Sequence, residues 1–311
     1  MGGNPARCGT VALIGRPNAG KSTLVNQLVG EKVAIVSPRP QTTRNRIVGI
    51  LNEERGQAVL FDLPGVHRPL HRMNTKMMRE VRSALKEVDL VLHLLDASRE
   101  WGRGEEFLFK LLEPVSVPVV GVLNKIDLVR PKSALLPLIE HYGRQRTDAE
   151  VFPISALKGE GMDVLRSRVF ELLPDGEPFY PADVSTTQSE RFFIAEAVRE
   201  QVLHNTHGEL PYTTGVIIDY LDESETLLRI DATIYVEKGS QKAIVIGKRG
   251  SMIKQIGQAA RLELEALLGI RIHLALHVKV HPRWRDDARV LLQMEPGLAT
   301  TDGVIQIDEP E

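Results

Sequence analysis

The feature that most constrains the fold is the segment Gly15–Ser22, which reads GRPNAGKS. It matches the pattern G-x-x-x-x-G-K-[ST], follows directly after the apolar run Val11–Ile14, and precedes a helical pattern. Glycines in such a loop let backbone N–H groups turn inward around phosphate oxygens, and the following helix N-terminus adds positive potential. Lys21 would reach the β- and γ-phosphates, and the Ser22 hydroxyl would ligate Mg²⁺. The segment therefore predicts a nucleotide site between a strand and a helix.

Short apolar runs alternate with helical patterns from residue 10 to about residue 173. The runs predicted as strands are Val11–Ile14, Arg46–Leu51, Ala58–Phe61, Leu90–Leu95, Val117–Leu123 and Val151–Ile154. The helices predicted between them are Asn74–Lys86, Glu105–Leu112, Ser133–His141 and Asp163–Leu172. Strands that alternate with helices favour a mostly parallel, doubly wound α/β sheet that is covered by helices on both faces.

Three further motifs follow predicted strands in the order in which P-loop GTPases carry them. Asp62–Gly65 (DLPG) supplies an Asp that can hold a Mg²⁺-bound water and a Gly whose N–H can reach the γ-phosphate. In Asn124–Asp127 (NKID), the Asp carboxylate can accept two hydrogen bonds from guanine, and adenine offers neither donor. Ser155–Lys158 (SALK) would offer backbone N–H to guanine O6. The residues assigned to the nucleotide are Gly15, Arg16, Pro17, Asn18, Ala19, Gly20, Lys21, Ser22, Thr23, Asp62, Leu63, Pro64, Gly65, Val66, Asn124, Lys125, Asp127, Ser155, Ala156 and Leu157.

With these motifs on one chain, residues 8–290 resemble the Era family, the bacterial ribosome-assembly GTPases. Gln41–Arg44 (QTTR) is similar to the switch I signature of that family. The resemblance implies that Thr43 senses the γ-phosphate through Mg²⁺. The implied Mg²⁺ ligands are Ser22, Thr43 and Asp62, and the implied catalytic residues are Lys21, Thr43 and Gly65.

Val66 stands where Ras-like GTPases carry a Gln that orients the attacking water. A valine side chain cannot hydrogen-bond that water, so we expect slow hydrolysis by the protein alone. Families with this substitution often use a K⁺ ion that is held partly by a P-loop Asn, and here that residue is Asn18. We therefore expect Mg²⁺ as the cofactor and K⁺ as a second candidate.

The second half of the chain carries a segregated charge. Residues 238–285 hold 10 basic and 2 acidic side chains, whereas residues 181–237 hold 3 and 11. Gly247–Gly250 (GKRG) lies inside the basic stretch, and such a loop can clamp the backbone of about four single-stranded nucleotides, as KH domains do. A solvated basic face with a capping glycine is the alternative, and the resemblance to a type II KH domain favours RNA. The residues assigned to RNA are Lys242, Gly247, Lys248, Arg249, Gly250 and Lys254.

The remaining elements and boundaries complete the prediction. Helices are predicted over Glu190–His204 and Ile253–Leu268, and strands over Thr214–Leu221, Leu227–Val236 and Arg271–Val280. Gln241–Ile246 has the β-branched residues of a strand, but the KH resemblance implies a short helix there, which we expect. Guided by the proline-bearing stretch 174–184, we divide the chain into a G domain (1–175), a linker (176–188), an α+β KH domain (189–290) and an acidic tail (291–311).

Composition excludes some classes of protein. The 311 residues include 39 basic and 41 acidic side chains, so the net charge of -2 alone points to no nucleic-acid partner. The single cysteine, Cys8, rules out an intramolecular disulfide and fits a reducing compartment. No apolar run approaches the ~20 residues that cross a bilayer. We expect a monomeric cytoplasmic protein, with peripheral association at the cytoplasmic face of the membrane as an open alternative.

The resemblance implies GTP and GDP as ligands, the 3′ end of 16S rRNA and the 30S subunit as partners, and maturation of that subunit as the role. One alternative is an Era-like GTPase in tRNA modification or cell-cycle signalling, whose extra domain would lack a basic G-x-x-G loop. Another is an RNA-binding protein with an inactive nucleotide domain, and an intact Lys21, Ser22, Asp62 and Asp127 argue against it.

Other features receive simpler interpretations. Trp284 is expected to anchor a core rather than stack on a base, and Cys8 to be a small buried side chain. His67 is not expected to act as a base, because phosphoryl transfer depends on positioning and charge more than on proton abstraction. A basic set at helical spacing is interpreted as a solvated helix face rather than an RNA-facing stripe, and its members are Arg68, Arg72, Lys76, Arg79 and Lys86.

Overall fold

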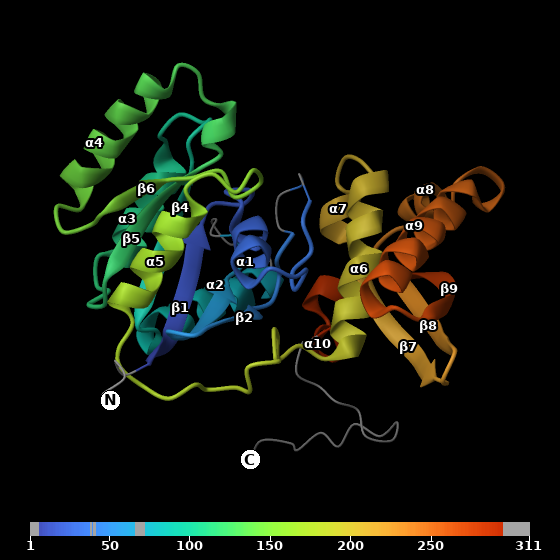
Figure 1. Ribbon diagram of the computed structural model, residues 1–311. Helices are drawn as coiled ribbons and strands as arrows, with labels where there is room; N and C mark the ends of the chain where they lie inside the picture. The colour runs from blue at the N-terminus through green and yellow to red at the C-terminus, as the bar shows by residue number, and fades with distance from the viewer. Residues whose placement is uncertain (1–5, 38, 40–41, 66–71, 295–311) are drawn as a thin grey trace, which may run out of the picture.

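The structure, a computed structural model, describes residues 6–37, 39, 42–65 and 72–294 and contains two separate sheets (Figure 1). The first sheet has the strand order β2-β3-β1-β4-β5-β6, in which β2 runs antiparallel to β3 and the other neighbours are parallel. Its strands are β1 (Arg7–Gly15), β2 (Ile47–Glu53), β3 (Gly56–Asp62), β4 (Leu90–Asp96), β5 (Val119–Asn124) and β6 (Val151–Pro153). The predicted α/β fold of this half is confirmed.

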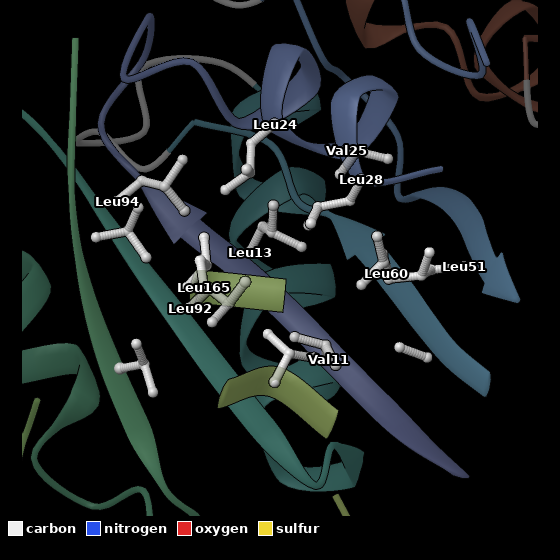
Figure 2. Close-up of a cluster of buried hydrophobic side chains, with 14 of the residues drawn as sticks. Val11, Leu13, Leu24, Val25, Leu28, Leu51, Leu60, Leu92, Leu94 and Leu165 are labelled. Atoms are coloured by element: carbon white, nitrogen blue, oxygen red, sulfur yellow. The ribbon is translucent and has the colours of Figure 1, made fainter. Parts of the chain in front are cut away.

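Helices cover both faces of the first sheet. They are α1 (Lys21–Val29), α2 (Arg72–Glu87), α3 (Arg103–Leu112), α4 (Leu136–Gln145) and α5 (Met162–Leu172). Because neighbouring side chains of a strand point to opposite faces, Val11 and Leu13 of β1 pack with α1 and α5 (Figure 2). Ala12 and Ile14 point the other way and pack with α2 and α3. All four side chains are fully buried, which is why this central strand reads as a continuous apolar run.

The second sheet has the order β7-β8-β9, with β7 and β8 antiparallel and β8 and β9 parallel. Its strands are β7 (Gly215–Glu223), β8 (Leu227–Val236) and β9 (Arg271–Val280), and the accompanying helices are α6 (Glu190–Asn205), α7 (Leu210–Thr213), α8 (Gly239–Ile246), α9 (Ser251–Leu268) and α10 (Ala288–Gln293). Side chains from α6, α8 and α9 form the core against one face of this sheet. The short helix expected between residues 241 and 246 is confirmed as α8, so the β-branched propensity of that stretch is overridden by its packing.

The segment between the two sheets is hydrogen-bonded to the first one. The amide of Ile50 on β2 donates to the Ser185 carbonyl at 2.8 Å, and the Thr186 hydroxyl donates to the Val48 carbonyl at 2.6 Å. The Gln57 side chain of β3 accepts from the amides of residues 179 and 180 at 2.8 and 3.0 Å. The expected linker therefore lies along the edge of the first sheet (Figure 1).

A small apolar cluster joins the two halves on the opposite face of the second sheet. Trp284 is fully buried and packs with Ile217, Tyr235 and Val290, and Met77 of α2 joins them from the first half. The Trp284 Nε1–H donates to the Thr213 carbonyl at 2.8 Å. Trp284 is therefore a core anchor as predicted, and α10 continues past the expected tail boundary at residue 290.

The remaining predictions concern Cys8, the basic residues of α2 and membrane-spanning segments. Cys8 is buried as expected, with 2% of its surface exposed. Arg79 and Lys86 are exposed on α2, which a solvated helix face and an RNA-facing stripe would both require. Gln41, Val66, His67 and Arg68 lie outside the described residues, as do the side chains of Arg72 and Lys76. Among the helices that the structure describes, none is long and apolar enough to cross a membrane.

Candidate functional site

A cavity of about 440 Å³ opens at the carboxyl edge of the first sheet, where β1 gives way to α1 and β5 to the following loop. Of the residues predicted to contact the nucleotide, those that line it are Pro17, Asn18, Gly20, Lys21, Ser22, Thr23, Gly65, Asn124, Lys125, Asp127 and Leu157. Thr43, predicted as the switch ligand, lines it as well. Five lining residues were not assigned to the nucleotide from the sequence: Val36, Ser37 and Arg99 lie in loops without a motif, Thr42 lies within the Gln41–Arg44 segment, and Leu128 follows Asp127 directly. The four motifs therefore converge on one cavity.

The loop before α1 requires glycine at position 20. Gly20 has φ 96° and ends the loop in the left-handed region. A Cβ at this position would lie 2.2 Å from the Asn124 amide nitrogen, so any side chain would displace the brace described below. The conformation directs the loop amides and the α1 N-terminus into the cavity, which favours an anionic ligand.

Lys21 is the buried cation of this loop, with 5% of its surface exposed. Its Nζ lies 3.4 Å from the carbonyls of both Gly15 and Arg16. Burial lowers the pKa of Lys21, and the neighbouring Asp62 carboxylate offsets part of that shift. A phosphate bound beside this buried ammonium would stabilise its charge strongly, because water screens the interaction only weakly there.

Three oxygen-bearing side chains meet beside Lys21. The Ser22 hydroxyl donates to Asp62 Oδ2 at 2.6 Å, Thr43 Oγ1 lies 3.1 Å from the same atom, and the two hydroxyl oxygens are 3.0 Å apart. Asp62 Oδ1 is buried and has no hydrogen-bond partner among the residues that the structure describes. Burial raises the pKa of Asp62, and Lys21 with the two hydroxyls opposes that shift. Mg²⁺ prefers hard oxygen ligands, and this group offers two hydroxyls and a carboxylate oxygen that is still available. These residues therefore fit the expected ion.

Gly65 lies against the phosphate loop. A Cβ on Gly65 would stand 2.8 Å from Pro17 Cα, so only glycine lets the two backbones approach this closely. The approach places the Gly65 backbone on the cavity wall beside the loop, as a γ-phosphate contact needs. Leu63 and Pro64 of the same motif are buried behind it, and the Leu63 amide bonds the Leu13 carbonyl at 3.4 Å.

Asn124 and Lys125 brace the opposite end of the cavity. Asn124 Nδ2 donates to the Ala19 carbonyl at 2.8 Å, and its Oδ1 accepts from the Ala156 amide at 3.0 Å. Lys125 Nζ donates to the Asn18 carbonyl and to Asp96 Oδ2, both at 2.6 Å. These bonds fasten the phosphate loop to the end of β5, so the two motifs form one rigid wall. Asp96 was missed, although an Asp directly after an apolar strand was a visible signal.

Asp127 and the segment after β6 form the base-facing end. The Ser155 hydroxyl donates to Asp127 Oδ1 at 2.6 Å, which fixes the carboxylate at the cavity wall. The amides of Ser155, Ala156 and Lys158 donate to protein acceptors. Within the described residues, the Leu157 amide is the one of this stretch for which no protein acceptor is seen. Arg16 faces away from the cavity, paired with Glu105 at 3.0 Å.

The second predicted site lies far along the chain, at the junction of α8 and α9. Gly247 has φ 74° and ψ 175°, and a Cβ there would stand 2.7 Å from the Met252 Cβ. Lys248, Arg249 and Lys254 are exposed and Lys242 is half-buried, and none of the four has an ion-pair partner among the described residues. Beside them Ile244 is 53% exposed. The junction thus presents free basic side chains and an open glycine backbone.

Comparisons with known proteins agree with both sites. A family model described as a 50S ribosome-binding GTPase matches residues 10–125, and the KH domain model matches residues 209–285. The GTPase Era of Heliobacterium modesticaldum is 47% identical over 286 residues, covering 92% of this chain and 95% of that protein. The GTPase Era of Xylella fastidiosa is 47% identical over 288 residues, covering 92% and 96%.

Two solved structures are similar to nearly the whole chain. An Aquifex aeolicus Era variant bound to GDP and AlF₄⁻ has a TM-score of 0.90 at 37% identity, covering 94% of this chain and all (100%) of that one. An Era in complex with MgGDPNP and nucleotides 1506–1542 of 16S ribosomal RNA has a TM-score of 0.91 at 36% identity, with the same coverage. The predicted pairing of a P-loop sheet with a KH domain is confirmed.

Proposed function

The chain belongs to the Era family of GTPases, and from this premise we propose that it hydrolyses GTP in the cavity and binds the 3′ end of 16S ribosomal RNA through the α8–α9 junction. The role would be maturation of the small (30S) ribosomal subunit by a monomer in the cytoplasm. The observation that carries the RNA assignment is the loop Gly247–Gly250, where Lys248 and Arg249, with no ion-pair partner among the described residues, follow a Gly247 backbone that only glycine permits. A related Era structure contains the corresponding RNA segment.

Hydrolysis would be an in-line attack of water on the γ-phosphate. Lys21 and the amides of the loop and of Gly65 would stabilise the charge that develops on the phosphoryl oxygens. Ser22, Asp62 and Thr43 would hold Mg²⁺, which neutralises charge on the β- and γ-phosphates when it is bound. Thr43 would be the ligand supplied by the Gln41–Arg44 segment, because Ser22 belongs to α1 and Asp62 ends β3.

K⁺ is proposed as a second ion at Asn18. Asn18 lines the cavity with φ 65°, and its carbonyl already accepts from Lys125. We expect turnover to be faster in KCl than in NaCl at one ionic strength, and the difference to vanish in Asn18→Ala. Equal rates in the two salts, or an unaltered K⁺ response in the variant, would remove K⁺ from the proposal.

The test of the RNA assignment is a salt titration with a labelled single-stranded oligonucleotide of the 16S 3′ end. Replacing Lys248 and Arg249 by Ala should remove two phosphate contacts. The slope of log affinity against log salt should then flatten by roughly 1.4, at about 0.7 per contact for single strands. Replacing Lys110 and Arg144, which are exposed on α3 and α4, by Ala is the matched control. A slope that stays the same in the first variant would move the RNA site elsewhere.

A further inference from the structure

The switch segment, residues 33–47 without 38, 40 and 41, is held from the KH side by two neighbouring residues of α6. Glu200 Oε1 accepts from the Val36 amide at 2.9 Å, and Arg199 Nη2 donates to the Thr42 carbonyl. Arg199 and Glu200 are 2% and 4% exposed, so both charges are dry. Buried charges that bond a backbone from another domain fix its position more strongly than exposed pairs do, because removing either partner leaves the other unsatisfied.

Arg44 reaches from the switch segment into the KH domain. Its Nη1 donates to the Thr214 carbonyl at 2.6 Å, and Nη2 donates to the Pro211 carbonyl at 3.1 Å. The guanidinium lies 5.8 Å from the Trp284 ring, whose own N–H fixes the neighbouring Thr213 carbonyl. Burial lowers the pKa of Arg44 to about 9, which leaves it charged at neutral pH. The Arg44 side chain thus binds the carbonyl groups at the C-terminal end of α7.

Thr43 lies between these two anchors and points the other way. The Thr42 carbonyl and the Arg44 side chain both contact the KH domain, whereas the Thr43 hydroxyl lies 3.0 Å from Ser22 Oγ and 3.1 Å from Asp62 Oδ2. Thr43 is 5% exposed, so its side chain has little other space. Its hydroxyl can stay at the Mg²⁺ site only while its two neighbours keep their places on the KH domain.

We propose that Arg44 and Arg199 are positioning residues for GTP hydrolysis, and that through them the KH domain holds Thr43 at the Mg²⁺ site. The proposal rests on the function proposed for Thr43, and it needs no RNA. Neither residue touches the nucleotide cavity, and neither was assigned a role by motif spacing. It assigns to α6 and α7 a part in the GTPase site that the first sheet alone does not provide.

An interface that only holds two domains together would give a different result. GDP has no γ-phosphate and makes no demand on Thr43, so a positioning role affects the GTP-bound state and spares the GDP-bound state. A purely structural role would lower the affinity for both nucleotides alike. Mg²⁺ dependence of nucleotide retention therefore separates the two interpretations without any measurement of turnover.

The experiment uses the full-length variants Arg44→Lys and Arg199→Met, with Arg191→Ala as the matched control. Lysine keeps the charge at position 44 but cannot bond two carbonyls at once. Arg191 is also on α6, and its guanidinium bonds Ile218 within the KH domain only. We expect kcat for GTP to fall about tenfold, and the Mg²⁺ concentration that retains a non-hydrolysable GTP analogue to rise about tenfold. GDP affinity should stay near wild type, and the control should match wild type throughout. The melting temperature of Arg199→Met should fall, because the Thr42 carbonyl and the Glu196 carboxylate lose a buried partner, so the comparison of GTP with GDP carries the test.

A double-mutant cycle with Thr43→Ala completes the test. If Arg44 acts through Thr43, Arg44→Lys should add no further loss of kcat on the Thr43→Ala background. Full additivity, an unchanged Mg²⁺ dependence, or equal losses for GDP and GTP would overturn the proposal. A failure of Thr43→Ala itself to change Mg²⁺ dependence would instead show that Thr43 is not a ligand, which is a failure of the proposed function. RNA binding enters none of these measurements.

Discussion

Asp127 is the residue that we expect to select guanine over adenine. Its Oδ1 is fixed by the Ser155 hydroxyl, and the carboxylate faces the cavity. Asp127→Asn replaces an acceptor by a donor, so GTP affinity should fall by about 2–5 kcal/mol while xanthosine triphosphate binds better. Nucleotide titrations of the variant and of an Asp148→Asn control, which changes an exposed side chain, measure this. Equal wild-type affinity for ATP and GTP would contradict the assignment.

His93 makes stability depend on pH. It is fully buried on β4, and burial, with repulsion from Arg146, lowers its pKa to about 3. Histidines of the unfolded chain have a pKa of about 6.5. Below that pH the unfolded chain therefore binds a proton at His93, whereas the folded chain leaves His93 neutral. Stability is lost as the pH falls from 6.5 toward 3, by about 1.4 kcal/mol per pH unit. In His93→Gln the slope of unfolding free energy against pH should be shallower by that amount. His273→Gln, an exposed change on β9, should leave the slope as it is in wild type.

The residues that motif spacing identified differ in kind from those it missed. Lys21, Ser22 and Asp127 line the cavity and Asp62 bonds Ser22, and all four stand at fixed offsets from a strand end, so local sequence could indicate them together. The function of Arg44 depends on carbonyls about 170 residues away, and nothing near it in the sequence indicates them. Local sequence patterns predict the secondary structure and the motif to which a segment belongs. Long-range hydrogen-bond partners depend instead on how the two domains dock.

At the scale of elements, the junction of α8 and α9 depends on one glycine. Gly247 adopts φ 74° and ψ 175°, a region that other residues avoid, and a Cβ would also meet Met252 at 2.7 Å. Gly247→Ala should cost about 1–3 kcal/mol of stability and weaken RNA binding by displacing the backbone. Thermal unfolding and RNA titration measure the two effects. Gly239→Ala at the start of α8 is the matched control, because a Cβ there meets nothing within 4 Å.

The same junction shows where sequence propensity fails. Residues 241–246 carry the β-branched side chains of a strand, yet they form α8, with Val245 fully buried against α9 and the sheet. Propensity is a weak preference that tertiary packing overrides. In the first sheet β1, β3, β4 and β5 were predictable because they are buried on both faces, and a motif follows β1, β3, β5 and β6. In α8 neighbouring apolar residues differ in burial, with Val245 buried and Ile244 53% exposed, and only the family resemblance identified the segment as a helix.

At the scale of the molecule, the two domains are joined by direct contacts as well as by the linker. The linker is bonded along β2, Met77 enters the Trp284 cluster, and Lys32 after α1 pairs with both Glu200 of α6 and Glu263 of α9. Burial opposes the charge of Lys32, but the two carboxylates outweigh it and raise its pKa. These contacts surround the switch segment, so the arrangement of the domains and that of the switch depend on each other.

GTP and RNA should therefore be thermodynamically coupled. If the γ-phosphate fixes Thr43 and Gly65 in one state only, as proposed, the contacts of Arg44, Arg199 and Glu200 would transmit that state to the KH domain. If GTP raises the affinity for RNA, RNA must raise the affinity for GTP by the same factor, because the cycle of binding steps closes. We expect about 5- to 150-fold tighter RNA binding with a non-hydrolysable GTP analogue than with GDP.

The measurement is RNA affinity at fixed salt with the analogue, with GDP and without nucleotide, together with the reverse titration of the analogue in the presence of RNA. The variant Lys32→Met tests whether the contacts between the domains carry the coupling. It leaves the cavity and the α8–α9 junction intact and removes only the pairing with Glu200 and Glu263. That variant should bind GDP and, in the absence of nucleotide, RNA as wild type does, while the coupling factor moves toward one. Three equal RNA affinities in wild type would mean that the domains act independently, since contacts that distinguish no nucleotide state can transmit none.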